Sequence, residues 1–114
     1  MKNGYQLLVL LQDKLNGADS ILTTLTSISK SEFAKDENRI MIGIGILNEI
    51  KEITYSLDEE VFVLNNNLYN LLMPIAKYAD NMFNQYKFVN AYKLYDVIKL
   101  NVPVLKQFLN KIKR

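Results

Sequence analysis

Apolar residues recur at alternating steps of three and four through almost the whole chain of 114 residues. Side chains at this spacing fall on one face of an α-helix, whereas a half-buried strand requires a step of two. The pattern therefore predicts an all-α fold. It occurs in four consecutive stretches: Leu8, Leu11, Leu15, Ala18, Leu22 and Leu25; Ile40, Gly43, Leu47, Ile50, Thr54, Leu57, Val61 and Leu64; Leu68, Leu72, Ile75, Ala79, Met82 and Tyr86; and Ala91, Tyr95, Ile98, Val102, Leu105, Leu109 and Ile112.

Polar segments separate these stretches. Residues 27–35 are mostly polar, and Asp36, directly after them, is of a type that caps helices. The cluster Asn65 to Asn67 is prone to turns and offers Asn67 as a cap, and Asn90 is suited to cap the last helix. The predicted helices comprise residues 5–28, 36–64, 67–86 and 90–112.

The boundary between the second and third predicted helices has an alternative. Ser56 and Glu59 have the spacing of a capping box, which would start the third helix earlier. The apolar pattern runs through both places and does not choose between them. We prefer the Asn cluster and leave the Ser56–Glu59 break open.

A chain of this length supports one hydrophobic core, so residues 1–114 are predicted to form a single domain. Short connections favour antiparallel neighbours, which predicts an up-down-up-down four-helix bundle. Pro74 and Pro103 lie inside the third and fourth predicted helices, where each removes a hydrogen bond and favours a kink. Gly43 lies on the core stripe, where a missing side chain permits close approach of a neighbouring helix.

The composition argues against most catalytic chemistry. The chain has no His and no Cys, which removes disulfides, thiolate nucleophiles, the usual general base and the commonest zinc ligands. The acidic residues Glu49, Glu52, Glu59 and Glu60 lie mostly off the apolar stripe. Gly43-Ile44-Gly45 lacks the third glycine of a nucleotide-binding loop. We therefore expect no catalytic residues, no cofactor and no metal, although an enzyme that uses Asp, Glu, Lys or Tyr stays open.

The expected location of the protein and the distribution of its charges restrict the kinds of partner that it is expected to bind. The longest uncharged stretch, Val61 to Ala76, contains four Asn residues, so no membrane span is expected. A chain without Cys fits a reducing cytoplasm. Residues 87–114 hold seven basic residues and one acid, Asp96, whereas residues 1–86 carry seven basic and eleven acidic residues. With one Arg in the basic segment, nucleic-acid binding is not expected, and an anionic protein is the preferred partner.

The last predicted helix carries more than one row of side chains beyond the core stripe. Lys99, Lys106 and Lys113 recur every seven residues and predict an exposed basic ridge; the alternative is a solvated face that complements the acidic second helix. Leu94, Val97, Val104 and Phe108 form a second apolar row. These residues and Tyr92 either widen the core face or contact a partner. We select the following as partner-binding residues: Leu94, Val97, Val104, Phe108, Tyr92, Lys99, Lys106 and Lys113.

The segment from Tyr95 to Leu105 resembles the close of small helical proteins of Gram-positive bacteria. At the level of fold the chain is similar to flagellar export chaperones and to bacteriocin immunity proteins, which implies a small, cytoplasmic, non-enzymatic protein. No residue motif is diagnostic of either family, so no binding residues are transferred.

Together these observations favour a non-enzymatic protein–protein interaction module of a bacterial cytoplasm, chaperone-like or adaptor-like. It would hold a partner helix in a groove formed by the first and last helices, or pair with itself as a homodimer. The alternatives are a bacteriocin-immunity-type protein, a small enzyme and a purely structural homodimer.

Overall fold

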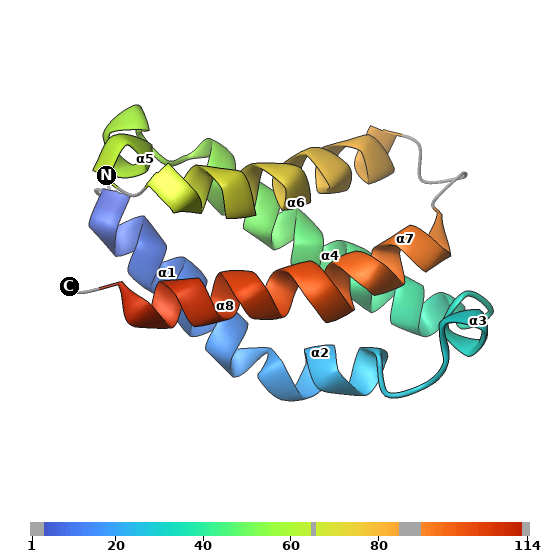
Figure 1. Cartoon of the computed structure of the whole chain (residues 1–114). Helices are drawn as coiled ribbons and strands as arrows, with labels where there is room; N and C mark the ends of the chain where they lie inside the picture. The colour runs from blue at the N-terminus through green and yellow to red at the C-terminus, as the bar shows by residue number, and fades with distance from the viewer. Residues whose placement is uncertain (1–3, 65, 85–89, 113–114) are drawn as a thin grey trace.

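The computed structural model describes residues 4–64, 66–84 and 90–112 of the chain (Figure 1). Within these ranges the regular elements are all helical and no strand occurs, which confirms the predicted all-α class. The elements are α1 (Gly4–Gly17), α2 (Asp19–Leu25), α3 (Lys30–Phe33), α4 (Glu37–Tyr55), α5 (Glu59–Leu64), α6 (Asn66–Asn84), α7 (Ala91–Asp96), the π-helical segment η2 (Val97–Asn101) and α8 (Val102–Lys111).

The first predicted helix, 5–28, is divided into α1 and α2 at Ala18. This residue adopts φ −91° and ψ 2°, outside regular helix geometry. Its amide nevertheless donates to the Lys14 carbonyl at 2.9 Å, and its carbonyl accepts from the Leu22 amide at 2.8 Å. Because hydrogen bonding continues across the break, α2 continues the rod begun by α1 after a local change in backbone direction. The helix α2 ends at Leu25.

The segment expected to be a simple connection contains α3. The Ser29 hydroxyl oxygen caps this short helix by accepting from the Glu32 amide at 3.1 Å. Phe33 is fully buried and meets the Tyr95 ring edge-on, with 5.5 Å between ring centroids. The connection is therefore part of the core and covers one side of α7.

α4 begins as predicted, because the Asp36 carboxylate accepts from the Arg39 amide at 3.1 Å and caps the helix. It ends at Tyr55, so the second predicted helix is shorter than 36–64. The chain leaves the helix at residues 56–58, forms α5, and then starts α6 at Asn66. A helix boundary therefore lies at each of the two predicted places, Ser56–Glu59 and the Asn cluster. Asn67 lies inside α6 and does not cap it.

The last rod consists of α7, η2 and α8. The Asn90 side chain accepts from the Lys93 amide at 3.1 Å, which confirms the predicted cap. In η2 the backbone hydrogen bonds have π-helical spacing, so the Val102 amide donates to the Val97 carbonyl, five residues back. Pro103 follows in the first turn of α8 and supplies no N–H to that ladder. Pro74 lies inside α6; bends at the two prolines stay predictions.

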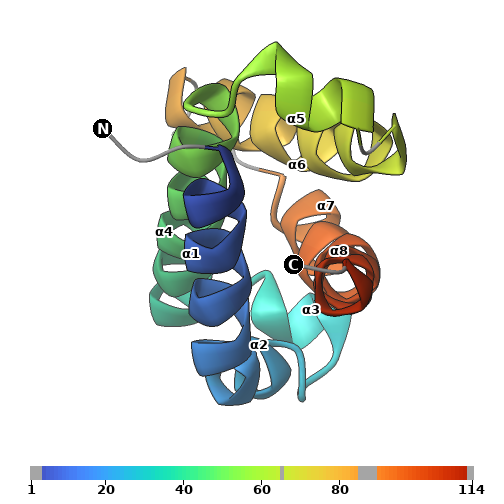
Figure 2. The same cartoon turned by 90° about the vertical axis from the view of Figure 1, so that its left-hand side faces the viewer.

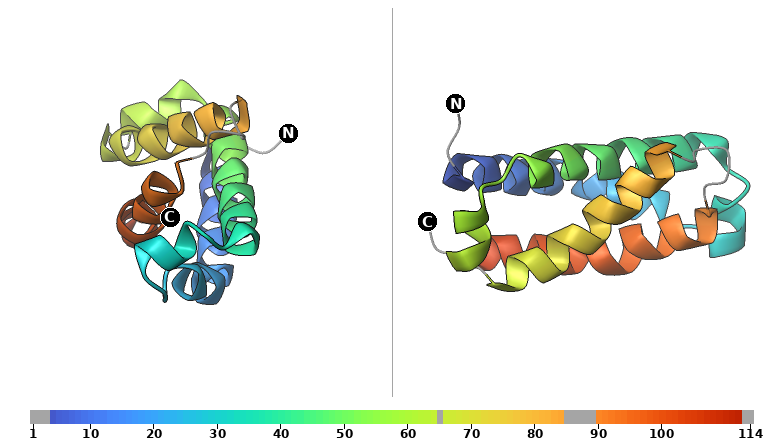
Figure 3. Two further views of the ribbon diagram at one scale, coloured as in Figure 1. Left: turned by 90° about the vertical axis from the view of Figure 1, so that its right-hand side faces the viewer. Right: turned by 90° about the horizontal axis from the view of Figure 1, so that it is seen from above.

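The α1–α2 rod and the α7–η2–α8 rod run in opposite directions. Contacts between them join early residues of one to late residues of the other: Gln12 with Asn110 and Asp19 with Lys106. Beyond the end of α2, Ile28 contacts Tyr95 near the start of the last rod. In the end view α1 and α4 lie side by side, and α5 and α6 cover one side of the molecule (Figure 2). From above, α6 crosses the other long helices obliquely (Figure 3). The up-down-up-down bundle therefore stays a prediction.

The core shows one unusually close helix contact. At Gly43 of α4 an added Cβ would lie 2.8 Å from Ile98 Cδ1 and 3.6 Å from a Leu94 methyl carbon. The absence of a side chain is thus what lets α4 approach the last rod, as the sequence predicted. At Gly45, two residues further along, an added Cβ would meet nothing within 4 Å.

Candidate functional site

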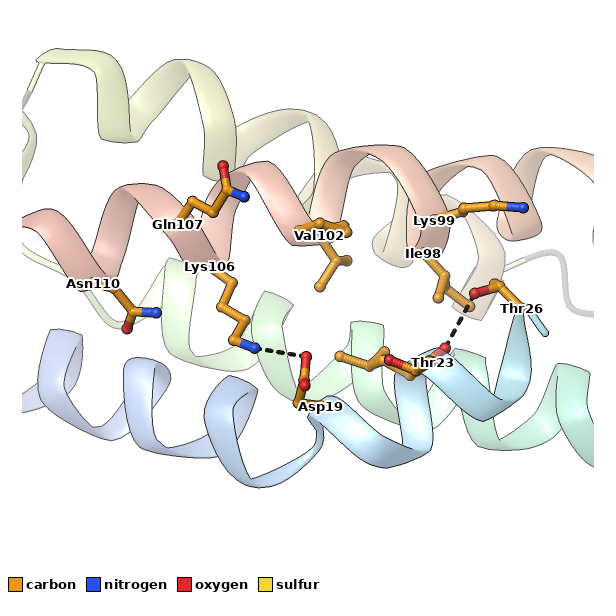
Figure 4. A pocket seen from close by; sticks show the side chains of 11 residues that line it. Asp19, Thr23, Thr26, Ile98, Lys99, Val102, Lys106, Gln107 and Asn110 are labelled. Carbon is orange, nitrogen blue, oxygen red and sulfur yellow. Dashed lines mark hydrogen bonds and ion pairs between the residues drawn. The ribbon is translucent and has the colours of Figure 1, made fainter.

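A groove lies between α2 and the last rod (Figure 4). Its volume is about 450 Å³. We call it the α2–α8 groove and define it by its lining. One wall consists of Asp19, Leu22, Thr23 and Thr26, and the other of Ile98, Lys99, Val102, Pro103, Lys106, Gln107 and Asn110.

Both walls of the groove contain an interruption of regular helix. On one side Asp19 directly follows the break at Ala18, and on the other Ile98 and Lys99 belong to the π-helical segment. α1 packs on α8, whereas α2 packs on η2. π-Helical turns are rare in proteins, and those that occur are often found at functional sites. The groove thus lies beside both interruptions, although most of its lining belongs to the regular helices α2 and α8.

Hydrogen bonds between the rods bound the groove at both ends. At one end Asn110 Oδ1 accepts from Gln12 Nε2 at 2.9 Å and from Asn16 Nδ2 at 3.4 Å. At the other end the Tyr95 hydroxyl donates to the Ile28 carbonyl at 2.9 Å. These bridges hold the two rods at a set separation on either side of the opening.

The floor of the groove is apolar. Leu22, Ile98 and Val102 are buried, and the exposed ring of Pro103 continues the apolar surface outward. On the α2 wall the Thr26 hydroxyl donates to the Leu22 carbonyl at 3.3 Å, so it turns toward its own helix. An apolar floor below polar walls suits an apolar side chain flanked by polar groups.

Two lysines and one aspartate set the charge of the groove. Lys106 Nζ lies 2.6 Å from Asp19 Oδ1, and this ion pair joins the two walls (Figure 4). The Lys106 side chain is 25% exposed and that of Asp19 58%. Lys99 Nζ donates to the Tyr95 hydroxyl at 3.1 Å and lies 5.2 Å from the centre of that ring. The lining therefore has a net positive charge.

The structure brings Lys99 and Lys106 of the predicted partner-binding residues to this groove. Lys106 pairs with Asp19 of α2, and both interpretations of the basic ridge stay predictions. Lys113 lies outside the described residues.

The predicted apolar row needs a correction. Leu94 is fully buried and Val97 is 5% exposed, so neither offers surface to a partner. Leu94 belongs to α7, which packs against both α3 and α4, and Val97 belongs to η2, which packs against α2 and α6. The last rod therefore buries a wide face. Because the segment containing α3 was expected to be a connection, this second cover was not foreseen.

The other predicted contacts lie outside the groove. Tyr92 and Val104 are each about half exposed, and Phe108 is half-buried against the core. None of the three lines the groove. The residues that sequence reasoning missed are mainly those of the opposite wall, Asp19, Thr23 and Thr26. The only signal for the site was the seven-residue spacing of the lysines, and this spacing does not reveal which helix faces them.

In the described part of the chain, no group of three or more His, Cys, Asp or Glu residues is placed to hold a metal ion. Within the same ranges, the helices are too short or too polar to cross a membrane. Burial raises the pKa of Tyr78 to about 12, and its hydroxyl donates to the Asn90 carbonyl at 3.1 Å. Tyr78 does not line the groove, and its hydrogen bond ties α6 to the start of α7.

Comparison with known proteins adds no family: no family model, no curated protein and no solved structure matches the chain. A functional proposal therefore rests on the groove and its chemistry.

Proposed function

We propose that the chain is a non-enzymatic binding module that holds an amphipathic helix of an anionic protein partner in the α2–α8 groove. The observation that carries the proposal is an apolar floor flanked by two lysines, Lys99 and Lys106, within one groove. In helix-in-groove recognition the apolar face of the incoming helix fills such a floor, while charges at the rim orient it.

The dimensions support a helical occupant. The bridges that bound the groove are formed by Tyr95 and Asn110, which are about 20 Å apart along the helical rod at 1.5 Å per residue. A segment of this length corresponds to about four helical turns, enough to place apolar side chains at positions i, i+3, i+4 and i+7.

The charge supports an acidic occupant. The described part of the last rod carries Lys93, Lys99, Lys106 and Lys111 against one acid, Asp96. Asp96 is itself paired with Lys30 at 2.8 Å. A positive surface beside an apolar floor raises the association rate of an acidic helix and disfavours a basic one.

In this proposal the long helices act as an antiparallel bundle, and a bend near Pro103 keeps one wall of the groove open. A cytoplasmic, chaperone-like or adaptor-like protein that shields a partner helix fits this arrangement. Self-association through the same groove is the competing use, and it is an outcome of the experiment below.

Site-specific photo-crosslinking in producing cells tests the proposal. A photoreactive residue at Gln107, on the groove wall, is compared with one at Lys77, which is exposed on α6. We expect a crosslinked segment specific to position 107 that is acidic and amphipathic with helical spacing. A crosslink from position 107 to a second copy of the chain would replace the proposal with homodimerisation.

The captured segment is then synthesised and its affinity measured. Thr23→Phe fills the groove, whereas Thr24→Phe adds the same side chain at the neighbouring position, which does not line it. Thr23→Phe is expected to weaken binding at least tenfold, and Thr24→Phe to leave it within twofold. Equal affinities of the two variants, or identical crosslinks from positions 107 and 77, would overturn the proposal.

A further inference from the structure

We infer that the groove selects a helix with two carboxylates seven residues apart, and that Asp19 competes with one of these carboxylates in the free protein. The inference rests on the proposed function and adds to it the pattern of the partner and a means of control.

The spacing follows from the two lysines. Lys99 and Lys106 line the same groove and are seven residues apart, which is about 10 Å along the helix. Val102 and Pro103 lie between them on the floor and the wall. An incoming helix that runs along the groove therefore meets both ammonium groups with acidic side chains at positions i and i+7. Its apolar side chains at i+3 and i+4 then face the floor.

The competition follows from the ion pair. The stem of Lys106 is largely covered, so its ammonium group is held at the groove, whereas the Asp19 side chain is more than half exposed. Asp19 is not the N-cap of α2, since Ala18 occupies that position. A partner carboxylate can replace the Asp19 carboxylate on Lys106 while α2 stays intact, and the exchange costs little because one ion pair replaces another.

Lys99 lacks such a competitor. Among the ion pairs of the described residues none involves Lys99, and its hydrogen bond to the Tyr95 hydroxyl uses one of three N–H donors. The two lysines therefore act differently: Lys99 attracts the first carboxylate directly, and Lys106 accepts the second only when Asp19 yields.

The probe is a synthetic amphipathic peptide with two glutamates seven residues apart and leucines at the third and fourth positions between them. A matched peptide has lysines in place of the glutamates. Affinities are measured by fluorescence anisotropy for the full chain and its variants at low and high salt. We expect the glutamate peptide to bind, more weakly at high salt, and the lysine peptide not to bind.

The variants separate competition from general charge. Asp19→Asn is expected to tighten binding of the glutamate peptide about two- to fivefold, the effect of one partly exposed ion pair, and Lys106→Gln to weaken it by a similar factor. Asp13→Asn, on an exposed residue of α1 that does not line the groove, makes the same change of charge and is expected to have no effect. Thermal unfolding of each variant verifies that it is folded.

The outcomes distinguish this inference from the proposed function. If both peptides bind equally and Thr23→Phe blocks both, the carboxylate pattern is overturned, while the proposed binding of a helix in the groove still stands. Unchanged or weaker binding by Asp19→Asn, or equal tightening by Asp13→Asn, would overturn the competition. If neither peptide binds while the captured natural segment does, the inferred pattern is wrong and the proposed function stands.

Discussion

Gly43 and Gly45 offer an internal test of how closely α4 approaches the last rod. The two glycines are two residues apart in one helix, and alanine at either position gains about 0.5–1 kcal/mol of helix propensity. Their surroundings differ, because a Cβ at Gly43 would lie 2.8 Å from Ile98 Cδ1, whereas a Cβ at Gly45 would meet nothing within 4 Å.

The magnitude follows from this contact. Relieving it requires Ile98 to move by about 1 Å from a site where it is 2% exposed, and overpacking of a core costs about 1–3 kcal/mol. Because the crowded atom is the end of the Ile98 side chain, the cost lies at the low end of this range, and Gly43→Ala should leave the free energy of unfolding about unchanged after the helix gain. Gly45→Ala should raise it by about 0.5–1 kcal/mol. In a domain of this size 1 kcal/mol corresponds to a Tm shift of about 4 °C.

Urea unfolding followed by far-UV circular dichroism measures both variants under the same conditions, with the m-value verifying two-state behaviour. Ile98→Val removes the Cδ1 atom, so in the Gly43→Ala background it should cost less than the roughly 0.5–1.5 kcal/mol expected in the wild type. If Gly43→Ala proves as stable as Gly45→Ala, the close packing of α4 on the last rod is refuted.

Three further predictions concern burial and hydrogen bonding. Leu94→Ala should cost about 2–5 kcal/mol in urea unfolding, whereas Val104→Ala, on the same rod but half exposed, should cost less than about 0.5 kcal/mol; equal costs would contradict the assignment of Leu94 to the core. Tyr95→Phe removes a hydrogen-bonded hydroxyl and should lower the free energy of unfolding by about 1 kcal/mol. Tyr92→Phe, at an exposed position one turn earlier, should leave it unchanged. Stability should fall as the pH rises from 10 to 12, because the Tyr78 phenol keeps its proton in the native state up to a pKa of about 12 but ionises near its ordinary value of 10.0 when unfolded; Tyr78→Phe should flatten this decline, and an unchanged pH profile would contradict the burial of the hydroxyl.

The features that sequence reasoning identified are local. The caps at Asp36 and Asn90 follow from side chains that reach amides three residues away, and the helical stretches follow from spacing along one chain segment. Gly43 was also identified, because a glycine on a core stripe has few explanations other than close packing.

The features that it missed depend on other parts of the molecule. The burial of a wide face of α7, which includes Leu94, requires α3 as well as α4, and the four residues of α3 are too few to show a helical period. The break at Ala18 keeps its hydrogen bonds and leaves the apolar phase unchanged. The apolar pattern therefore does not reveal it, and the sequence signal for it is Gly17, a helix-weakening residue at the end of α1. The groove needs the relative placement of two rods, which no spacing within either rod encodes.

The hydrogen bond between Gln12 and Asn110 joins residues 98 positions apart, and this separation bears on synthesis. One wall of the groove leaves the ribosome early and the other only after α8 has been translated. Until then the first rod is covered by α4 and α5 but not by the last rod, so the nascent chain exposes the apolar face that α8 and η2 later cover. The groove requires both rods, so a chain arrested before α8 has been synthesised exposes apolar surface but has no α2–α8 groove.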